Sequence, residues 1–152
     1  VIAAKDILEK DFNIQANVWS ATSINELTRE GRKVERENLL HPGEKEKIPY
    51  VTQCLQDTQG PVICATDYMK QYSEQLRAYM PNDKTYVTLG TDGFGRSDSR
   101  EKLREFFEVN RYFVVIASLY ALMKEGKIEA KQLKAAMKKF GISPDKLDPL
   151  YH

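Results

Sequence analysis

The segment from Gly90 to Arg100 holds the densest group of residues that could do chemistry. Its three glycines follow a predicted strand and precede a predicted helix, so their backbone N–H groups could bind an anion, assisted by two arginines. The spacing Gly90-x-x-Gly93-x-Gly95 matches neither the dinucleotide-binding fingerprint nor the P-loop. Two aspartates also place negative charge where a phosphate would lie. We therefore predict a structural turn in which Gly93 or Gly95 has a positive φ.

Histidines and cysteines, the other residues that could bind a metal or act as nucleophiles, are few. The histidines are His41 and His152, and the cysteines are Cys54 and Cys64. His41 lies thirteen positions before Cys54, and the cysteines are ten positions apart, which is not the spacing of zinc ligands. Neither histidine accompanies a serine or cysteine in a nucleophile motif. We predict no metal site, and we expect Cys64 to be a core residue of an apolar strand.

Length and composition are those of one ordinary globular domain. The chain has 152 residues, of which 41% are hydrophobic and 30% are charged. The 23 Lys and Arg residues nearly balance the 22 Asp and Glu residues, so we expect neither a nucleic-acid partner nor a membrane partner. Two cysteines exclude a disulfide scaffold and suit a reducing, cytoplasmic compartment. The longest apolar runs, such as Phe113–Ser118, fall far short of the ~20 residues of a membrane span.

The N-terminal third is predicted to contain a helix, a strand and a second helix. Apolar residues have helical spacing over the first ten positions, and alternation over Ile14–Trp19 is typical of a strand. Ser23 or Asn25 can then cap a short helix. Residues 30–49 are strongly charged and are interrupted by His41-Pro42-Gly43, so we expect a surface excursion outside the core.

Strands and helices alternate along the rest of the chain. Short apolar runs predict buried strands at Val62–Ala65 and Tyr86–Leu89, separated by a helix over Tyr68–Met80. Further helices are predicted to begin near Ser99 and to span Asn110–Lys124 and Glu129–Phe140. This alternation indicates an α/β domain with a mostly parallel sheet. The loops that follow its three strands would share the carboxyl edge of the sheet, which is the predicted functional surface.

Three motifs, in their order and spacing, resemble one enzyme family. They are Asn17–Ser23 (NVWSATS), Thr66–Lys70 (TDYMK) and Leu89–Arg100 (LGTDGFGRSDSR), supported by Leu39–Pro42 (LLHP) and Pro49-Tyr50. All resemble the C-terminal end of the homodimeric pyruvate dehydrogenases, the thiamine-diphosphate-dependent first components of bacterial pyruvate dehydrogenase complexes. The resemblance covers nearly the whole chain. It implies a transketolase-like C-terminal domain, with a three-layer α/β/α fold and a mostly parallel mixed sheet.

The resemblance also implies that residues 1–152 are a single C-terminal domain of a longer chain. The opening helix has no capping residue at Val1, which favours the same interpretation. In the family a further strand leads into this helix, so we expect the first strand of the sheet to be missing. The alternative is a free-standing α/β binding or regulatory module.

The family decarboxylates pyruvate on thiamine diphosphate, which is held with Mg²⁺, and passes the acetyl unit to a lipoyl group of the dihydrolipoyl acyltransferase component. Its Mg²⁺–diphosphate motif and its catalytic residues lie on upstream domains, and Thr91-Asp92-Gly93 is not that motif. We therefore assign no catalytic, cofactor-binding or metal-binding residue. We expect this chain alone to be inactive and to bind neither thiamine diphosphate nor Mg²⁺.

The expected role is that of a scaffold and dimerisation domain that borders the active-site entrance. Its partners would be the remaining domains of the enzyme, the second subunit of a homodimer and the acyltransferase component. A polar loop with balanced charges suits a hydrogen-bonded contact between domains or subunits better than a site for an anionic substrate. The candidate interface residues are Asp92, Arg96, Ser97, Asp98 and Arg100.

Overall fold

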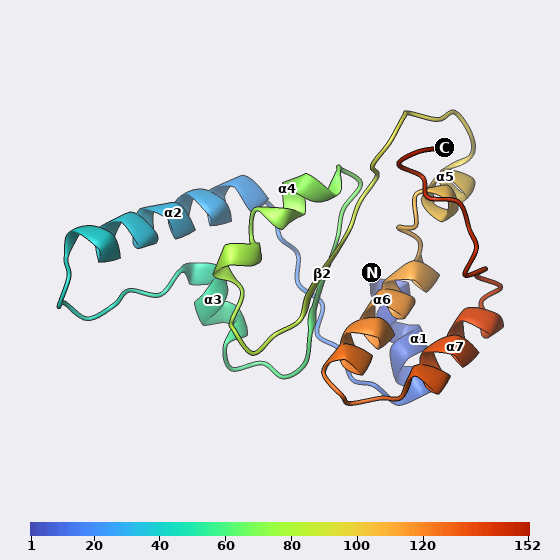
Figure 1. Cartoon of the computed structure of the whole chain (residues 1–152), viewed down its shortest axis with the longest axis horizontal. Coiled ribbons are helices and arrows are strands. Elements are labelled where there is room, and N and C mark those ends of the chain that lie inside the picture. Colours follow the sequence, from blue (N-terminus) through green and yellow to red (C-terminus); the bar gives the residue numbers. More distant parts are fainter.

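Two short strands lie in the middle of the computed structural model, which describes all 152 residues (Figure 1). β1 (Val62–Ala65) and β2 (Tyr86–Leu89) pair in parallel and in register over their full length. The crossover between them contains the helix α4 (Lys70–Glu74) and the 3-10 helix η1 (Arg77–Tyr79). Both strands were predicted at these positions, and their parallel pairing is confirmed. The prediction that they are buried is wrong for every strand residue except Tyr86, because the others are only partly buried.

Helices cover both faces of this sheet (Figure 1). On one side lie α2 (Ile24–Leu40), α3 (Tyr50–Leu55) and α4. On the other side lie α1 (Ile2–Phe12), α6 (Arg111–Lys124) and α7 (Ala130–Lys139). The short helix α5 (Arg100–Phe106) leads from the glycine-rich loop into α6.

Side chains of the two strands alternate between two hydrophobic cores, as the pleat of a strand requires. Cys64 and Tyr86 join the first core, and Ala65 and Leu89 join the second. The buried members of the first core are Ile24, Val51, Leu55, Leu76, Tyr79, Met80 and Tyr86. Those of the second core are Ala4, Leu8, Val114, Val115, Leu119 and Ala136. Cys64 packs against the first core but is only partly buried, so the prediction that it is a core residue is confirmed in part.

α6 is the central helix of the second core, as its nearly all-round apolar sequence predicts. Asn110 caps it, because the Asn110 side-chain oxygen accepts from the backbone N–H groups of the next turn at 2.9 and 3.1 Å. The stretch Arg100–Lys124 is long and apolar enough, by length and composition, to be compared with a membrane span. It consists of two helices, however, and α6 packs against α1, α7 and both strands. We therefore interpret α6 as a core helix.

The prediction of a strand at Ile14–Trp19 is wrong. The segment forms neither helix nor strand, although Ile14 and Ala16 pack against the second core while Gln15 and Asn17 are exposed. No backbone–backbone hydrogen bond joins residues 15–22 to another segment. Alternation describes which side chains are buried, whereas a strand also needs a partner for its backbone, and no neighbour supplies one here. The sheet therefore contains only β1 and β2.

The prediction of a surface excursion over residues 30–49 is only partly right. Residues 30–40 continue α2, which starts at the predicted cap Ser23. Gly31 and Val34 are buried on the inner face of α2. The charged residues lie on its outer face. The high charge therefore belongs to an amphipathic helix, in which one narrow buried stripe is sufficient for packing.

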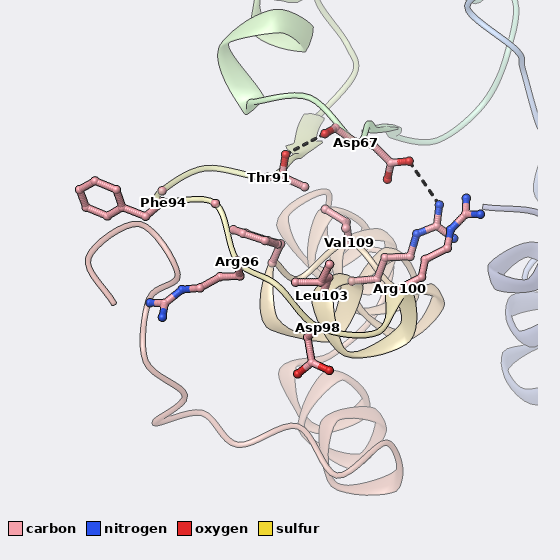
Figure 2. Close-up of a pocket in the computed structure, with 12 residues that line it drawn as sticks. Asp67, Thr91, Phe94, Arg96, Asp98, Arg100, Leu103 and Val109 are labelled. Carbon is pink, nitrogen blue, oxygen red and sulfur yellow. Dashed lines mark hydrogen bonds and ion pairs between the residues drawn. The ribbon is translucent and has the colours of Figure 1, made fainter.

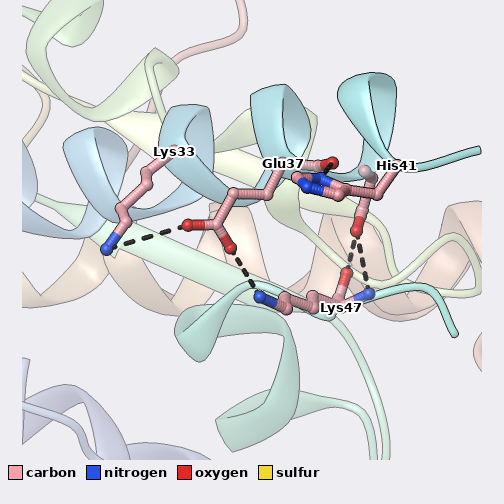
Figure 3. Close-up of polar contacts among 5 residues, drawn as sticks. Lys33, Glu37, His41 and Lys47 are labelled. Atoms are coloured by element: carbon pink, nitrogen blue, oxygen red, sulfur yellow. Dashed lines mark hydrogen bonds and ion pairs between the residues drawn. The ribbon is translucent and has the colours of Figure 1, made fainter. Parts of the chain in front are cut away.

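Polar contacts fasten the loop 41–49 to the end of α2 (Figure 3). Lys47 Nζ donates to Glu37 Oε2 at 2.8 Å, and the backbone of Lys47 exchanges two hydrogen bonds of 2.9 Å with the side-chain amide of Asn38. His41 Nδ1 lies 2.8 Å from the carbonyl oxygen of Glu37. α2 ends at His41, as the His-Pro-Gly sequence predicts.

The predicted helix over Tyr68–Met80 is broken into α4 and η1. The carbonyl oxygen of Ser73 accepts the Tyr86 hydroxyl at 2.9 Å and the Leu76 N–H at 3.1 Å. The Leu76 bond has the spacing of a 3-10 helix, and the Tyr79 N–H repeats it on Leu76 at 2.9 Å. The tighter winding turns Tyr79 into the first core, where it is 6% exposed. The hydrogen bond from Tyr86 of β2 to Ser73 therefore lies where the α-helix ends. The helical spacing of apolar residues cannot predict such a bond, because its donor lies in another element.

A network of hydrogen bonds ties α4 to β2. Glu74 accepts from Arg77 Nε at 2.5 Å and from Arg77 Nη2 at 2.8 Å, and it accepts from Thr88 Oγ1 at 2.5 Å. Arg77 Nη1 donates to the carbonyl oxygen of Tyr86 at 3.0 Å. The hydrogen bonds from Arg77 hold the pKa of Glu74 below its ordinary value of 4.5, although partial burial acts in the opposite direction.

Glu74→Gln is expected to lower the free energy of unfolding at neutral pH by about 1–2 kcal/mol, because hydrogen bonds to a charged group are lost. A carboxyl whose pKa is lower in the folded state stabilises the fold above its unfolded pKa, and this contribution disappears as the pH falls through the folded pKa. The difference between wild type and variant therefore shrinks below pH 4.5. Urea denaturation at neutral pH and at about pH 3 measures it. Glu105→Gln, at an exposed carboxylate without an ion pair, is the control, and an undiminished difference in acid would contradict the prediction.

Candidate functional site

The loops that follow β1 and β2 meet at the carboxyl edge of the sheet, as predicted from parallel strands. Thr91 N–H donates to the carbonyl oxygen of Tyr68 at 2.9 Å, and Thr91 Oγ1 donates to the carbonyl oxygen of Asp67 at 2.8 Å (Figure 2). Asp92 Oδ1 accepts the Lys70 N–H at 3.0 Å, and the Lys70 ammonium lies 3.9 Å from Asp92 Oδ2. These bonds make one connected structure of the two loops.

Two glycines allow this close approach. Gly90 is buried, and a Cβ atom there would lie 2.6 Å from the Tyr68 carbonyl oxygen and 2.7 Å from the Lys70 nitrogen. Gly93 has φ +100°, and a Cβ atom there would clash with the carbonyl oxygen of Pro149. The prediction that Gly93 or Gly95 has a positive φ is confirmed at Gly93. The glycines therefore serve a structural turn.

The C-terminal tail packs against this loop, which the sequence pattern did not predict. Lys146 Nζ donates to the Phe106 carbonyl oxygen at 2.9 Å and to Glu108 Oε1 at 3.1 Å. The same ammonium lies 5.6 and 5.8 Å from the ring centroids of Phe106 and Phe113. Lys146 thereby anchors the tail at the junction of α5 and α6, from which Pro149 reaches Gly93.

A cavity of about 470 Å³ opens between the glycine-rich loop and α5 (Figure 2). Leu103, Phe107 and Val109 supply apolar side chains to its lining. Its charged lining residues are Asp67, Arg96, Asp98, Arg100 and Arg104. The cavity is therefore amphipathic, and arginine is its only basic residue type.

The five predicted interface residues do not converge on one point. Asp92 turns toward Lys70, and Asp98 Oδ1 accepts the Ser99 N–H at 2.6 Å. The Arg96 guanidinium stacks over the Phe106 ring, with its central carbon 5.0 Å from the ring centroid. In Figure 2 Arg96 and Arg100 extend to opposite sides of the loop. Ser97 and Arg100 are exposed and have no side-chain partner in the chain.

Sequence reasoning missed two charged residues of this region. Arg104 Nη2 lies 3.3 Å from Asp67 Oδ2, which joins α5 to the loop after β1 (Figure 2). Asp67 lies at the carboxyl end of a predicted strand, and Arg104 follows Arg100 by one helical turn. The sequence therefore placed each residue near the predicted functional surface, but only the tertiary structure shows that the two side chains pair.

No histidine or cysteine lines this cavity. His41 ends α2, Cys54 lies in α3, and Cys64 lies in β1. Both cysteines are free thiols of intermediate burial. No group of three or more His, Cys, Asp or Glu side chains is arranged to hold a metal ion.

Comparisons with known proteins place the chain beside one group of enzymes. Residues 1–110 match the transketolase-like TK C-terminal domain family. The chain is 56% identical over 147 residues to the pyruvate dehydrogenase E1 component of Pseudomonas aeruginosa, and 49% identical over 146 residues to that of Escherichia coli K12. The corresponding protein of Cupriavidus necator is 49% identical over 150 residues. These alignments cover 96–99% of this chain, which spans only 16–17% of the length of the curated relatives.

Proposed function

The chain belongs to the transketolase-like C-terminal domain family, and from this membership we propose that residues 1–152 serve as the C-terminal domain of a pyruvate dehydrogenase E1 component. The observation that carries the proposal is 56% identity over 97% of the chain to one such component. The longer enzyme would decarboxylate pyruvate with thiamine diphosphate and Mg²⁺ and acetylate lipoyl groups of its acyltransferase partner. Thiamine diphosphate would supply the electron sink for that decarboxylation.

The residues of this chain do not fit the cofactor or its metal ion. The only Asp-Gly step in the glycine-rich loop is Asp92-Gly93, and the Asp92 carboxylate is already bound by the Lys70 backbone and side chain. Magnesium requires several oxygen ligands in near-octahedral geometry, and no suitable cluster of carboxylates lies in this chain. We therefore propose that this domain supports the enzyme through contacts, without supplying a ligand to the cofactor.

A strand from the longer polypeptide would complete the sheet. β1 has β2 on one edge and no strand on the other. Residues 15–22 likewise make no backbone–backbone hydrogen bonds, although Ile14 and Ala16 are held against the second core. Backbone groups at a sheet edge are available for pairing with a further strand, and a strand that precedes α1 would supply a partner. The mass of the native polypeptide tests this proposal, since a native chain of 17.5 kDa would instead favour a free-standing module.

Exposed apolar side chains near the loops support a contact with a neighbouring domain or subunit. Phe94 is 82% exposed, and Tyr68 is 68% exposed. Single exposed apolar residues are common, but aromatic residues together with arginine are typical of protein interfaces. The Arg96 guanidinium stacks on the Phe106 ring, and Arg96 follows Phe94 by two residues in the loop. We propose that Arg96 supplies the main polar interaction of this contact.

In the full-length enzyme, Arg96→Ala is expected to weaken the dimer about tenfold, because an arginine at the centre of an interface commonly contributes that much binding free energy. Catalysis would decline with the dimer, without a selective rise in KM for the 2-oxo acid. Analytical ultracentrifugation and steady-state kinetics measure the two effects. Arg36→Ala, at an exposed arginine of α2 without an ion pair, is the matched control.

The opposite pattern would contradict the scaffold role. If Arg96→Ala leaves the dimer intact and selectively raises KM, the loop contacts substrate. If Arg36→Ala weakens the dimer equally, the effect arises from net charge, and Arg96 has no specific place in the contact.

A further inference from the structure

Two arginines of α5 border the cavity on the side away from Arg96 (Figure 2). Arg100 and Arg104 are one helical turn apart, so their side chains leave the same face of the helix. Arg104 pairs with Asp67, and in Figure 2 Arg100 extends toward the same aspartate. The volume of about 470 Å³ lies within the range of small-molecule sites. Shape alone therefore permits a ligand of modest size.

The charges on this side of the cavity do not balance. Asp67 pairs with Arg104 at 3.3 Å, through a single guanidinium nitrogen. Asp98 accepts the Ser99 N–H, and its side chain points away from Arg100 (Figure 2). Arg100 has no carboxylate partner. Like charges one turn apart destabilise a helix, so an anion bound between the two arginines would relieve their repulsion.

The apolar lining limits the kind of anion. Leu103 lies in α5 with the two arginines, Phe107 is the residue that ends this helix, and Val109 follows two residues later. All three are partly buried and line the cavity. A fully hydrated inorganic ion gains nothing from such a surface, whereas an apolar group attached to the anion would be removed from water there.

We infer that this cavity binds a small organic anion that carries one oxyanion head group, a phosphate or a carboxylate, on an apolar body. The guanidinium fork of Arg100 matches two oxygens of either head group, and the unused N–H groups of Arg104 can donate to a third position. Asp67 holds Arg104 in place. The apolar body lies against Leu103 and Phe107.

Calorimetric titration of the full-length enzyme, saturated with thiamine diphosphate and Mg²⁺, tests the inference with four probes. Phenyl phosphate and benzoate carry both features, inorganic phosphate carries the head group alone, and benzyl alcohol carries the apolar body alone. We expect phenyl phosphate or benzoate to bind at least about tenfold more tightly than inorganic phosphate, and benzyl alcohol not to bind. The preference between the first two probes identifies the head group.

Charge-neutralising variants locate the binding. Arg100→Gln and Arg104→Gln are each expected to raise Kd about tenfold, because a hydrogen bond between charged groups is lost. Lys102→Gln removes the same charge from an exposed position of α5 that does not line the cavity, and it should leave Kd unchanged. Absence of saturable binding, equal binding of inorganic phosphate, or an equal loss in Lys102→Gln would overturn the inference. Dimerisation is measured separately through Arg96→Ala, so this inference and the proposed function can fail independently.

Discussion

Leu119→Ala is expected to lower the free energy of unfolding by about 3–5 kcal/mol, the largest effect of any substitution considered. Leu119 is 1% exposed and belongs to the second core, where α6 meets α1, α7 and the sheet. Removing a buried leucine side chain loses its transfer free energy and leaves a cavity. α1, α7 and both strands pack against α6, so the cavity cannot close through the movement of one flexible segment. Urea denaturation followed by far-UV circular dichroism measures the change.

Leu39→Ala is the matched control for this prediction. Leu39 lies near the end of α2 and is 76% exposed, so its truncation should change the free energy of unfolding by no more than about 0.5 kcal/mol. A loss below about 1 kcal/mol in Leu119→Ala would contradict the central position of α6. Two separate transitions in the urea denaturation curve of Leu119→Ala would show that the two cores unfold independently.

Gly90→Ala is expected to lower the free energy of unfolding by about 2–3 kcal/mol, because it overpacks a site closed by backbone atoms. The added Cβ would lie 2.6 Å from the Tyr68 carbonyl oxygen and 3.0 Å from the Met69 carbonyl carbon. These atoms cannot move away easily, since Tyr68 accepts the Thr91 N–H at 2.9 Å. The substitution would separate the two loops at the carboxyl edge, so it should also weaken the proposed anion binding.

Gly95→Ala distinguishes this close approach from a general effect of glycine in the loop. No atom lies within 4 Å of the position that a Cβ would occupy at Gly95, and its φ is not positive. Replacing such a glycine restricts the unfolded chain and is expected to leave stability unchanged or raise it by up to about 1 kcal/mol. Equal thermal midpoints for the two variants would contradict the contact that we describe at Gly90.

Local sequence determined the elements whose stabilising contacts are close in the chain. The caps at Ser23 and Asn110 lie next to the helices they begin, and the apolar runs of β1 and β2 are continuous. Order and spacing of three motifs were sufficient to identify the family, because those motifs extend over most of the chain. A positive φ at Gly93 or Gly95 was also predictable, since few other residues adopt that conformation in a turn, and the structure places it at Gly93.

Tertiary structure decided the features that depend on a distant partner. Ile14–Trp19 has the alternation of a strand but no neighbouring backbone, and the helix after β1 is broken by the Tyr86 hydroxyl thirteen residues away. The pairing of Asp67 with Arg104 spans 37 positions, and the anchoring of Lys146 on Phe106 spans 40. Such contacts depend on where the chain returns in space, which periodicity and propensity do not encode. The sequence by itself therefore determined the family and most helices, whereas packing alone decided the size of the sheet and the charge balance of the cavity.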